Sequence, residues 1–123
     1  KLEIQDEFIC KSELDKKLSW EQIKQVRKNN LITIGGHTHT HKILSFLNSE
    51  ELSFELDTSI ELLEKKGNTK VIHYSYPEGL KHCFNKKVIQ ELKIRGVKCC
   101  PTAMEGKNNC KSSPFLLKRI MVG

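Results

Sequence analysis

The hydrophobic positions of the chain follow two spacings, one typical of amphipathic helices and one of short buried strands. In the first helical pattern, Trp20, Ile23 and Val26 recur three residues apart, directly after Ser19. Serine is a preferred N-cap residue, and Gln22 stands where the partner of a capping box would be. This segment therefore predicts a helix that begins after Ser19.

Two further helices are predicted downstream by the same logic. Asn48 caps the longer one with Glu51 as reciprocal partner, and Gly67 ends it. The apolar stripe of this helix recurs at steps of three or four residues and consists of Leu52, Leu56, Ile60 and Leu63. Asn85 caps the next helix, and Gly96 closes it.

Short apolar runs between the helices predict strands. These runs are Leu31–Ile34, Val71–Tyr74, Val97–Cys100 and Leu116–Val122. Strands that alternate with helices indicate a parallel sheet with helices outside. A closed (β/α) barrel needs about eight strands, and this chain supplies about four. The sequence thus predicts an α/β fold, as an open sheet or as part of a barrel, in a single domain over residues 1–123.

The most informative segment follows the first predicted strand. Gly35-Gly36 leads into His37, His39 and His41, and sites in parallel α/β folds form at the carboxyl ends of strands. If the chain turns helical here, His37 and His41 share one face, where they could hold one metal ion, and His39 points elsewhere. Two alternatives are a polar turn with solvent-facing histidines and a metal site that uses His37 and His39.

The charge pattern is typical of the solvated surface of an ordinary globular domain and does not by itself indicate a function. The net charge is +6, with 21 basic residues spread among 15 acidic ones. No dense basic cluster or nucleic-acid-binding signature occurs, so we do not expect a nucleic-acid partner. No apolar run approaches the roughly 20 residues of a membrane helix, and we expect no membrane span.

The five cysteines are odd in number, two are adjacent, and none forms a CxxC pair. This usage is unlike a disulfide framework and favours a reducing compartment, with the cysteines packed in the core. No signal-peptide core is visible either. A cytoplasmic location is therefore favoured. The cell envelope remains an alternative, because we expect that the start of the protein is not included.

The histidine segment, read with its neighbours, resembles the polysaccharide deacetylase family (carbohydrate esterase family four, the NodB homology domain). The run from His37 to His41 matches that family's H-[S/T]-x-x-H motif. The helix start at 18–22, the loop Tyr74–Gly79 and the segment Phe115–Ile120 resemble further family features in the correct order. The resemblance implies a partial (β/α) barrel of the deacetylase type.

The resemblance also implies a chemistry, namely hydrolysis of N-acetyl groups on a polysaccharide or glycan. His37 and His41 would be ligands of a divalent metal ion, with zinc favoured and cobalt or nickel as alternatives. Such an ion polarises the acetyl group and activates a water molecule. The partner implied is an acetylated glycan.

Other site residues follow from the same resemblance. The turn Pro77-Glu78-Gly79 would supply a main-chain N–H to the oxyanion, which makes Glu78 a candidate catalytic residue, with Pro77 and Gly79 beside the substrate. Arg119 is the second candidate, as a cation that orients a carboxylate. Tyr74 and Tyr76 would stack on a sugar ring or, equally, pack in the core or at its rim.

The departures from the family concern its acids and its motif residues. The aspartate pair of the first motif is absent, and Asp6, Asp15 and Asp57 stand in the wrong context to replace it. Ser75 holds the place of an arginine in the third motif. No late Leu-x-His motif occurs, and neither His73 nor His82 matches it.

We therefore expect that the chain begins after the first motif, that one or more N-terminal strands are missing, and that the fragment alone is inactive. The alternative function is a non-catalytic carbohydrate-binding or structural remnant of the deacetylase fold.

Overall fold

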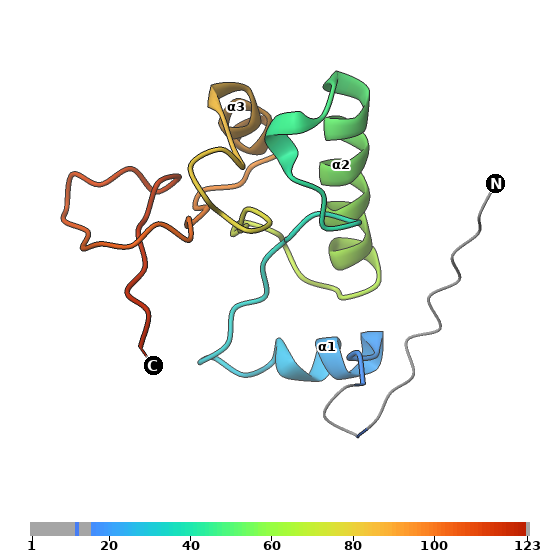
Figure 1. Cartoon of the computed structure of the whole chain (residues 1–123). Helices are drawn as coiled ribbons and strands as arrows, with labels where there is room; N and C mark the ends of the chain where they lie inside the picture. Colours follow the sequence, from blue (N-terminus) through green and yellow to red (C-terminus); the bar gives the residue numbers. More distant parts are fainter. Residues whose placement is uncertain (1–11, 13–15, 123) are drawn as a thin grey trace.

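The computed structural model describes Ser12 and residues 16–122. Four helical elements occur in this part of the chain (Figure 1). They are the α-helices α1 (Trp20–Val26), α2 (Ser49–Lys65) and α3 (Lys86–Ile94), and the 3₁₀ helix η2 (Leu44–Phe46). None of these helices is long and apolar enough to cross a membrane.

The predicted helix starts are confirmed. The side chain of Ser19 accepts from the Gln22 N–H, and the Gln22 side chain accepts in return from the Ser19 N–H. Asn48 and Glu51 form the same reciprocal box at the start of α2. Asn85 accepts from a backbone N–H of α3. Each cap satisfies N–H groups that lack a partner inside the helix.

The segments between the helices pair in parallel, as predicted. The Gly36 N–H donates to the His73 carbonyl at 2.9 Å, and the Ser75 N–H donates to the Gly36 carbonyl at 2.9 Å. The next segment continues the arrangement, with a parallel bridge between His73 and Cys99. A third parallel bridge joins Glu105 to Arg119. These bridges make a layer of three neighbouring segments near 36, 74 and 99. The third segment then pairs with the C-terminal segment, where the Thr102 N–H donates to the Leu117 carbonyl at 2.8 Å.

The pairing is shorter than predicted, because the described residues contain isolated bridges and no regular strand. The prediction of a buried strand at Leu31–Ile34 was wrong at its start. Leu31 lies in a turn with 93% of its surface exposed, and Ile32 is 45% exposed. No described element covers these side chains, so their apolar character does not place them in the core. The end of the Leu116–Val122 run is also exposed, because no described element covers it.

Neighbouring residues of the paired segments face opposite sides, as in extended chain generally. Tyr74 and Tyr76 lie in the core with the buried faces of α2 and α3. His73 and Ser75 instead line an open groove of about 380 Å³ on the other side. The layer thus has one face covered by helices and one face that borders the groove.

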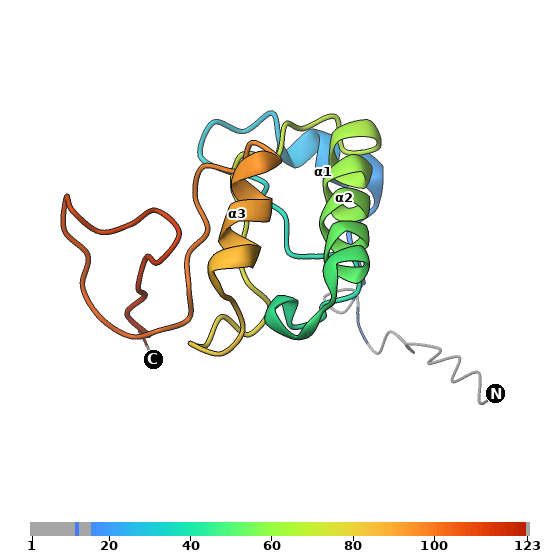
Figure 2. The same cartoon turned by 90° about the horizontal axis from the view of Figure 1, so that it is seen from above.

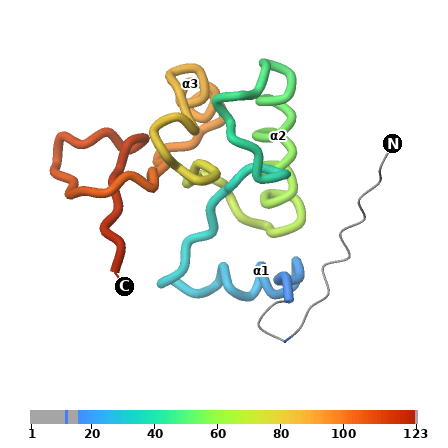
Figure 3. The backbone as a smooth tube through the Cα atoms, in the orientation of Figure 1, coloured from blue at the N-terminus to red at the C-terminus, as the bar shows by residue number. Residues whose placement is uncertain are grey.

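The two long helices cover the same face of the layer. α2 and α3 contact each other and lie side by side in both views (Figure 2). Arg95, at the end of α3, joins them, because its guanidinium donates to the Asp57 carboxylate of α2 at 2.6 and 3.0 Å. Figure 3 follows the backbone from α1 up to residues 36–42 beside α2. The chain after residue 103 forms a long loop that projects away from α2.

Gly36 is required where the first two segments meet. A Cβ at this position would lie 2.1 and 2.3 Å from two ring carbons of Tyr74, whose ring is 2% exposed. Real side chains do not tolerate such contacts, so the ring or the backbone would have to move.

We therefore predict that Gly36→Ala lowers the free energy of unfolding by about 3 kcal/mol, the upper end of the usual cost of overpacking, measured by chemical denaturation. Gly96→Ala is the matched control. A Cβ there meets nothing within 4 Å, but φ is +81°, so only backbone strain of about 1–2 kcal/mol is expected. A Gly36→Ala cost no larger than that of the control would contradict the close packing of Tyr74 on Gly36.

Candidate metal centre

Residues 37–42, called here the histidine loop, contain two strained backbone positions. Thr38 has φ 67° and His41 has φ 62°, both in the left-handed region that residues with a Cβ rarely adopt. The loop is not helical, so the prediction of a helical turn here was wrong. The His37 and His41 rings nevertheless lie close together, with centroids 4.8 Å apart at 67°, and their role as ligands of one metal ion stays a prediction. Two left-handed residues bring the rings together instead of one helical turn.

The strained loop is held by a buried carboxylate from α2. The N–H groups of His39 and Thr40 donate to Glu55 Oε2 at 2.9 and 2.8 Å. The Thr40 hydroxyl donates to Glu55 Oε1 at 2.5 Å. Glu55 is 1% exposed, and three donors satisfy a charge that would otherwise be costly to bury. This carboxylate therefore fixes the middle of the histidine loop.

The electrostatics of Glu55 agree with this role. Burial by itself raises the pKa of a carboxyl group, but the hydrogen bonds from Thr40 and His39 outweigh it. With a smaller contribution from the charge of Lys42, they lower the pKa of Glu55 below its ordinary value of 4.5. Glu55 is therefore charged at neutral pH.

A second anchor holds the start of the loop. The Thr38 N–H donates to the Tyr74 hydroxyl at 2.7 Å, and that hydroxyl lies 2.7 Å from Ser59 Oγ. The Ser59 hydroxyl donates to the Leu56 carbonyl at 3.0 Å, so the hydrogen between the two hydroxyls comes from Tyr74. Burial raises the pKa of Tyr74 to about 12. The phenol therefore stays protonated and completes a chain of hydrogen bonds from the loop into α2.

Ser75 orients the His37 ring. Its Nδ1 lies 3.0 Å from the Ser75 carbonyl and 2.8 Å from Ser75 Oγ. Because a carbonyl can only accept, this contact favours the tautomer with the hydrogen on Nδ1, which would leave Nε2 as the ligand atom. This is the usual arrangement of a metal-binding histidine, in which a backbone carbonyl orients the ring. His39 takes no part, since its ring packs against Phe54 with centroids 5.8 Å apart.

The two tyrosines predicted to touch a sugar lie in the core. Tyr74 and Tyr76 are each 2% exposed. The Tyr76 ring stacks on Phe84 at 4.4 Å, and its hydroxyl donates to the Phe115 carbonyl at 3.1 Å. This burial favours packing, the alternative that the sequence left open, over contact with a sugar ring.

The remaining predicted residues do not contact the histidine pair. Arg119 is exposed, and its N–H donates to the Met104 carbonyl at 2.9 Å. Glu78 is exposed with φ 58°. Pro77 and Gly79 are buried in the same turn. No hydrogen bond or ion pair among the described residues joins Arg119 or Glu78 to His37 or His41, and their catalytic roles stay predictions.

The aspartates and cysteines singled out in the sequence lie away from the histidine pair or outside the described residues, except for Cys99, which lines the same groove as His37. Asp57 pairs with Arg95, which agrees with its exclusion from the site. Asp6 and Asp15 lie outside the described residues. Cys83 and Cys100 are buried, as predicted for core cysteines, whereas Cys99 is partly exposed and Cys110 is exposed. All four are free thiols. The fifth, at position 10, lies outside the described residues.

As a candidate metal centre, the histidine loop supplies two imidazole ligands. Their ring centroids lie 4.8 Å apart, which makes the pair the candidate ligand set for one ion. Within the part of the chain that the structure describes, no third histidine, cysteine, aspartate or glutamate joins this pair. Catalytic zinc sites usually have three protein ligands. The pair is therefore an incomplete donor set by itself.

Sequence reasoning missed Glu55, the residue that shapes the loop. A signal was present, because Glu55 and Ser59 lie on the buried side of α2 together with Leu52 and Leu56. A carboxylate on an apolar face needs a buried donor nearby. That donor is the backbone of the histidine loop, which only the tertiary structure brings there.

Comparison with solved structures identifies the fold. The chain is similar to a Streptococcus pyogenes deacetylase, PplD, in complex with acetate, with a TM-score of 0.75, 24% identity, and coverage of 85% of this chain and 45% of that one. A polysaccharide deacetylase from Bacillus cereus, BC0361, gives a TM-score of 0.68 and 26% identity over 88% of this chain and 33% of that one.

A third similar structure is the BpsB deacetylase domain from Bordetella bronchiseptica. Its TM-score is 0.74 at 17% identity, covering 85% of this chain and 49% of that one. The chain thus spans less than half the length of each of these structures. No curated protein matches the chain.

The fold and the histidine loop therefore define a deacetylase-type domain. Residues 6–100 match the polysaccharide deacetylase family. The chain belongs to that family, as the histidine motif predicted.

The buried carboxylate gives a testable prediction. Because the folded state lowers the pKa of Glu55, its stabilising effect is complete above the ordinary value of 4.5 and is lost as the pH falls through the folded-state pKa. We expect the free energy of unfolding to decrease as the pH falls from about 5 to about 3. Glu55→Gln should lack this component and be about 1.5–3 kcal/mol less stable at pH 7, measured by denaturation at each pH.

Glu61→Gln is the control for this experiment. Glu61 is an exposed residue on the same helix that pairs with Lys65, and its replacement should change stability by less than about 0.5 kcal/mol. Equal effects of the two substitutions would show that Glu55 does not hold the loop.

Proposed function

We propose that the domain to which this chain belongs hydrolyses N-acetyl groups on a polysaccharide in a metal-dependent reaction. The observation that carries this proposal is the meeting of His37 and His41 in a loop fixed by Glu55, with His37 oriented by the Ser75 carbonyl. Family membership supports deacetylation as the reaction class. The donor set supports the metal dependence.

His37 and His41 would hold the ion, and zinc is the first candidate because two imidazoles suit it, with cobalt and nickel as alternatives. A bound ion of this kind supplies Lewis-acid chemistry to an acetyl group and acidifies a water molecule. The chain's own residues position the ligands. Glu55 and Tyr74 hold the loop in its strained conformation, and Ser75 orients the His37 ring through contacts with Nδ1.

The groove beside the pair is a candidate approach for substrate. Its lining includes Gly35, His37, His73, Ser75 and Pro101. Downstream, the turn Pro77-Glu78-Gly79 presents main-chain groups, and no described backbone carbonyl accepts from the Glu78 N–H. This N–H is therefore a candidate donor to the oxyanion of the acetyl group, and the side chain of Glu78 need not take part.

We further propose that the parallel layer is part of a (β/α) barrel, which the similar structures support. The described residues bring no carboxylate to the histidine pair as third ligand or general base. A catalytic domain therefore needs these groups from elsewhere, and the 123-residue chain alone should react slowly at best. If they are lacking altogether, the alternative is a non-catalytic carbohydrate-binding domain, which the serine at position 75 in place of the motif arginine also favours.

The metal ligands can be tested by zinc titration followed through the NMR signals of the histidine rings. We expect the signals of His37 and His41 to shift together, and the His41 shift to disappear in His37→Ala because one imidazole holds zinc weakly. His39→Ala is the matched control from the same loop and should leave the titration unchanged. Unaltered His41 shifts in His37→Ala would reject the shared site.

The reaction can be tested by acetate release from N-acetylated oligosaccharides with added zinc or cobalt. We compare the 123-residue chain with a polypeptide in which the family's aspartate motif precedes it. A general base contributes about 10²–10⁴-fold, so the longer polypeptide should be at least 100-fold faster, and His41→Ala should abolish its activity. Rapid turnover by the 123-residue chain would place the base within it. Oligosaccharide binding by both polypeptides without acetate release would favour the non-catalytic alternative.

A further inference from the structure

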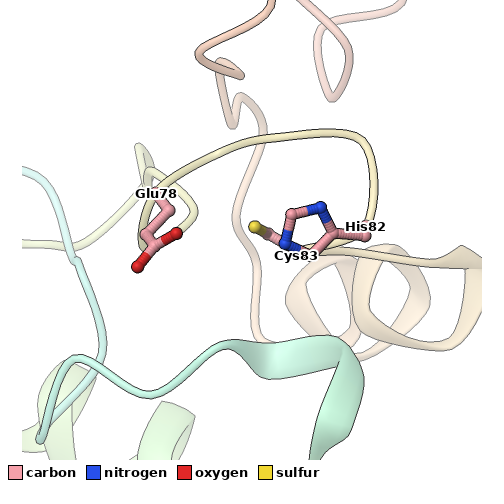
Figure 4. A group of neighbouring side chains, drawn as sticks. All are labelled: Glu78, His82 and Cys83. Carbon is pink, nitrogen blue, oxygen red and sulfur yellow. The ribbon is translucent and has the colours of Figure 1, made fainter.

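A second group of metal-ligating side chains lies outside the histidine loop. Glu78, His82 and Cys83 each offer one ligand atom, and these atoms all lie within 4.8 Å of one another. Figure 4 shows the Glu78 carboxylate facing the His82 ring and the Cys83 sulfur across the loop that leads to α3. The three side chains come from six consecutive residues. Family membership assigns no role to this combination.

We propose that Glu78, His82 and Cys83 form a zinc site. A thiolate, an imidazole and a carboxylate are the three side-chain ligand types that zinc accepts, and the mixture of soft and hard donors suits zinc better than calcium or magnesium. Ligand atoms around a tetrahedral zinc ion lie about 3.3–3.8 Å apart. The group therefore has to close by at most about 1.5 Å, which the exposed side chains of Glu78 and His82 allow by rotation.

The backbone on the Glu78 side is fixed before any ion binds. Glu78 and Gly79 have φ values of 58° and 69°, so the chain reverses sharply here. The Ala103 N–H donates to the Gly79 carbonyl at 2.9 Å, and the Cys83 N–H donates to the Leu80 carbonyl at 2.9 Å. These bonds hold the two ends of the loop in register. A non-glycine residue in the left-handed region is unusual and often marks a functional turn.

The His82 side is fixed independently by the segment that follows the histidine loop. The Ser45 N–H donates to the Cys83 carbonyl at 3.3 Å, and the Ser45 hydroxyl donates to the His82 carbonyl. The Phe46 ring stacks on the His82 ring with centroids 6.1 Å apart at 20°. Two ligands are thus positioned by η2, which reduces the entropy lost when an ion binds.

One ligand of the group is buried and two are exposed, which suits a zinc site at the surface. Cys83 is 0% exposed, whereas Glu78 and His82 are exposed. The sulfur therefore lies just beneath the two exposed ligands, at the base of the site. Binding deprotonates the Cys83 thiol and releases one proton to solvent. The thiolate and the Glu78 carboxylate together then neutralise the double charge of the ion, and the fourth position stays open to water.

The consequence is structural. The ion would tie both ends of the 78–83 loop together, next to the Pro77-Glu78-Gly79 turn and to Ser45. Zinc at this site should therefore stabilise the fold separately from any role of the histidine pair.

The test uses cobalt(II) as a spectroscopic probe in the 123-residue chain. A cobalt–thiolate bond gives a near-ultraviolet charge-transfer band, which a site made of His37 and His41 cannot produce because it holds no sulfur. We expect one equivalent of cobalt to produce this band, zinc to displace it, and Cys83→Ser to remove it. Cys10→Ser and Cys110→Ser, as matched cysteine controls, should keep it, and so should the double variant His37→Ala/His41→Ala.

Because Cys83 is buried, its replacement could disturb folding, and two exposed ligands supply the independent test. His82→Ala and Glu78→Gln should each weaken cobalt binding by at least about 10-fold while the folded circular dichroism spectrum is kept. Zinc should raise Tm in the wild type and not in His82→Ala. Absence of the band in the wild type, its loss in either cysteine control, or unchanged affinity in both ligand variants would overturn the proposal.

Discussion

The contact on which the candidate site depends is the acceptance of three hydrogen bonds by the buried Glu55 carboxylate. A loop with left-handed residues at Thr38 and His41 is strained and would relax if left alone. Glu55 binds the N–H groups of His39 and Thr40 and the Thr40 hydroxyl, so the strained conformation also satisfies the buried charge. These hydrogen bonds stabilise both the strained loop and the buried carboxylate. In the resulting conformation the rings of His37 and His41 lie side by side.

Tyr74, a core residue, holds the start of the histidine loop. Tyr74 fills the space beside Gly36 and passes a chain of hydrogen bonds from Thr38 through Ser59 to the backbone of α2. The same ring therefore sets the packing of the parallel layer and anchors the first residues of the histidine loop. Substitutions in the core at this point should disturb the site without touching a ligand, because packed interiors transmit small shifts.

Two groups of potential ligands flank one short segment of chain. The histidine loop ends just before η2, and Ser45 and Phe46 of η2 contact His82 and Cys83. His37 of the histidine pair lines the groove, and the chemistry proposed for this pair acts on an acetyl group. The Glu78, His82 and Cys83 group lies at a fixed loop end and suits a structural ion. Their different donors, nitrogen only in one and sulfur in the other, allow them to be distinguished in solution.

The sequence by itself determined the helices and the family. Capping residues act within four residues of chain, so Ser19, Asn48 and Asn85 could be identified from local sequence. The histidine motif indicated the candidate ligand pair. Only the tertiary structure decided how the histidines meet, because the donors of Glu55 come from 15 and 16 residues away. It also decided that Leu31 is exposed and Tyr74 buried. Burial depends on which segments lie opposite, and spacing along the chain does not contain that information.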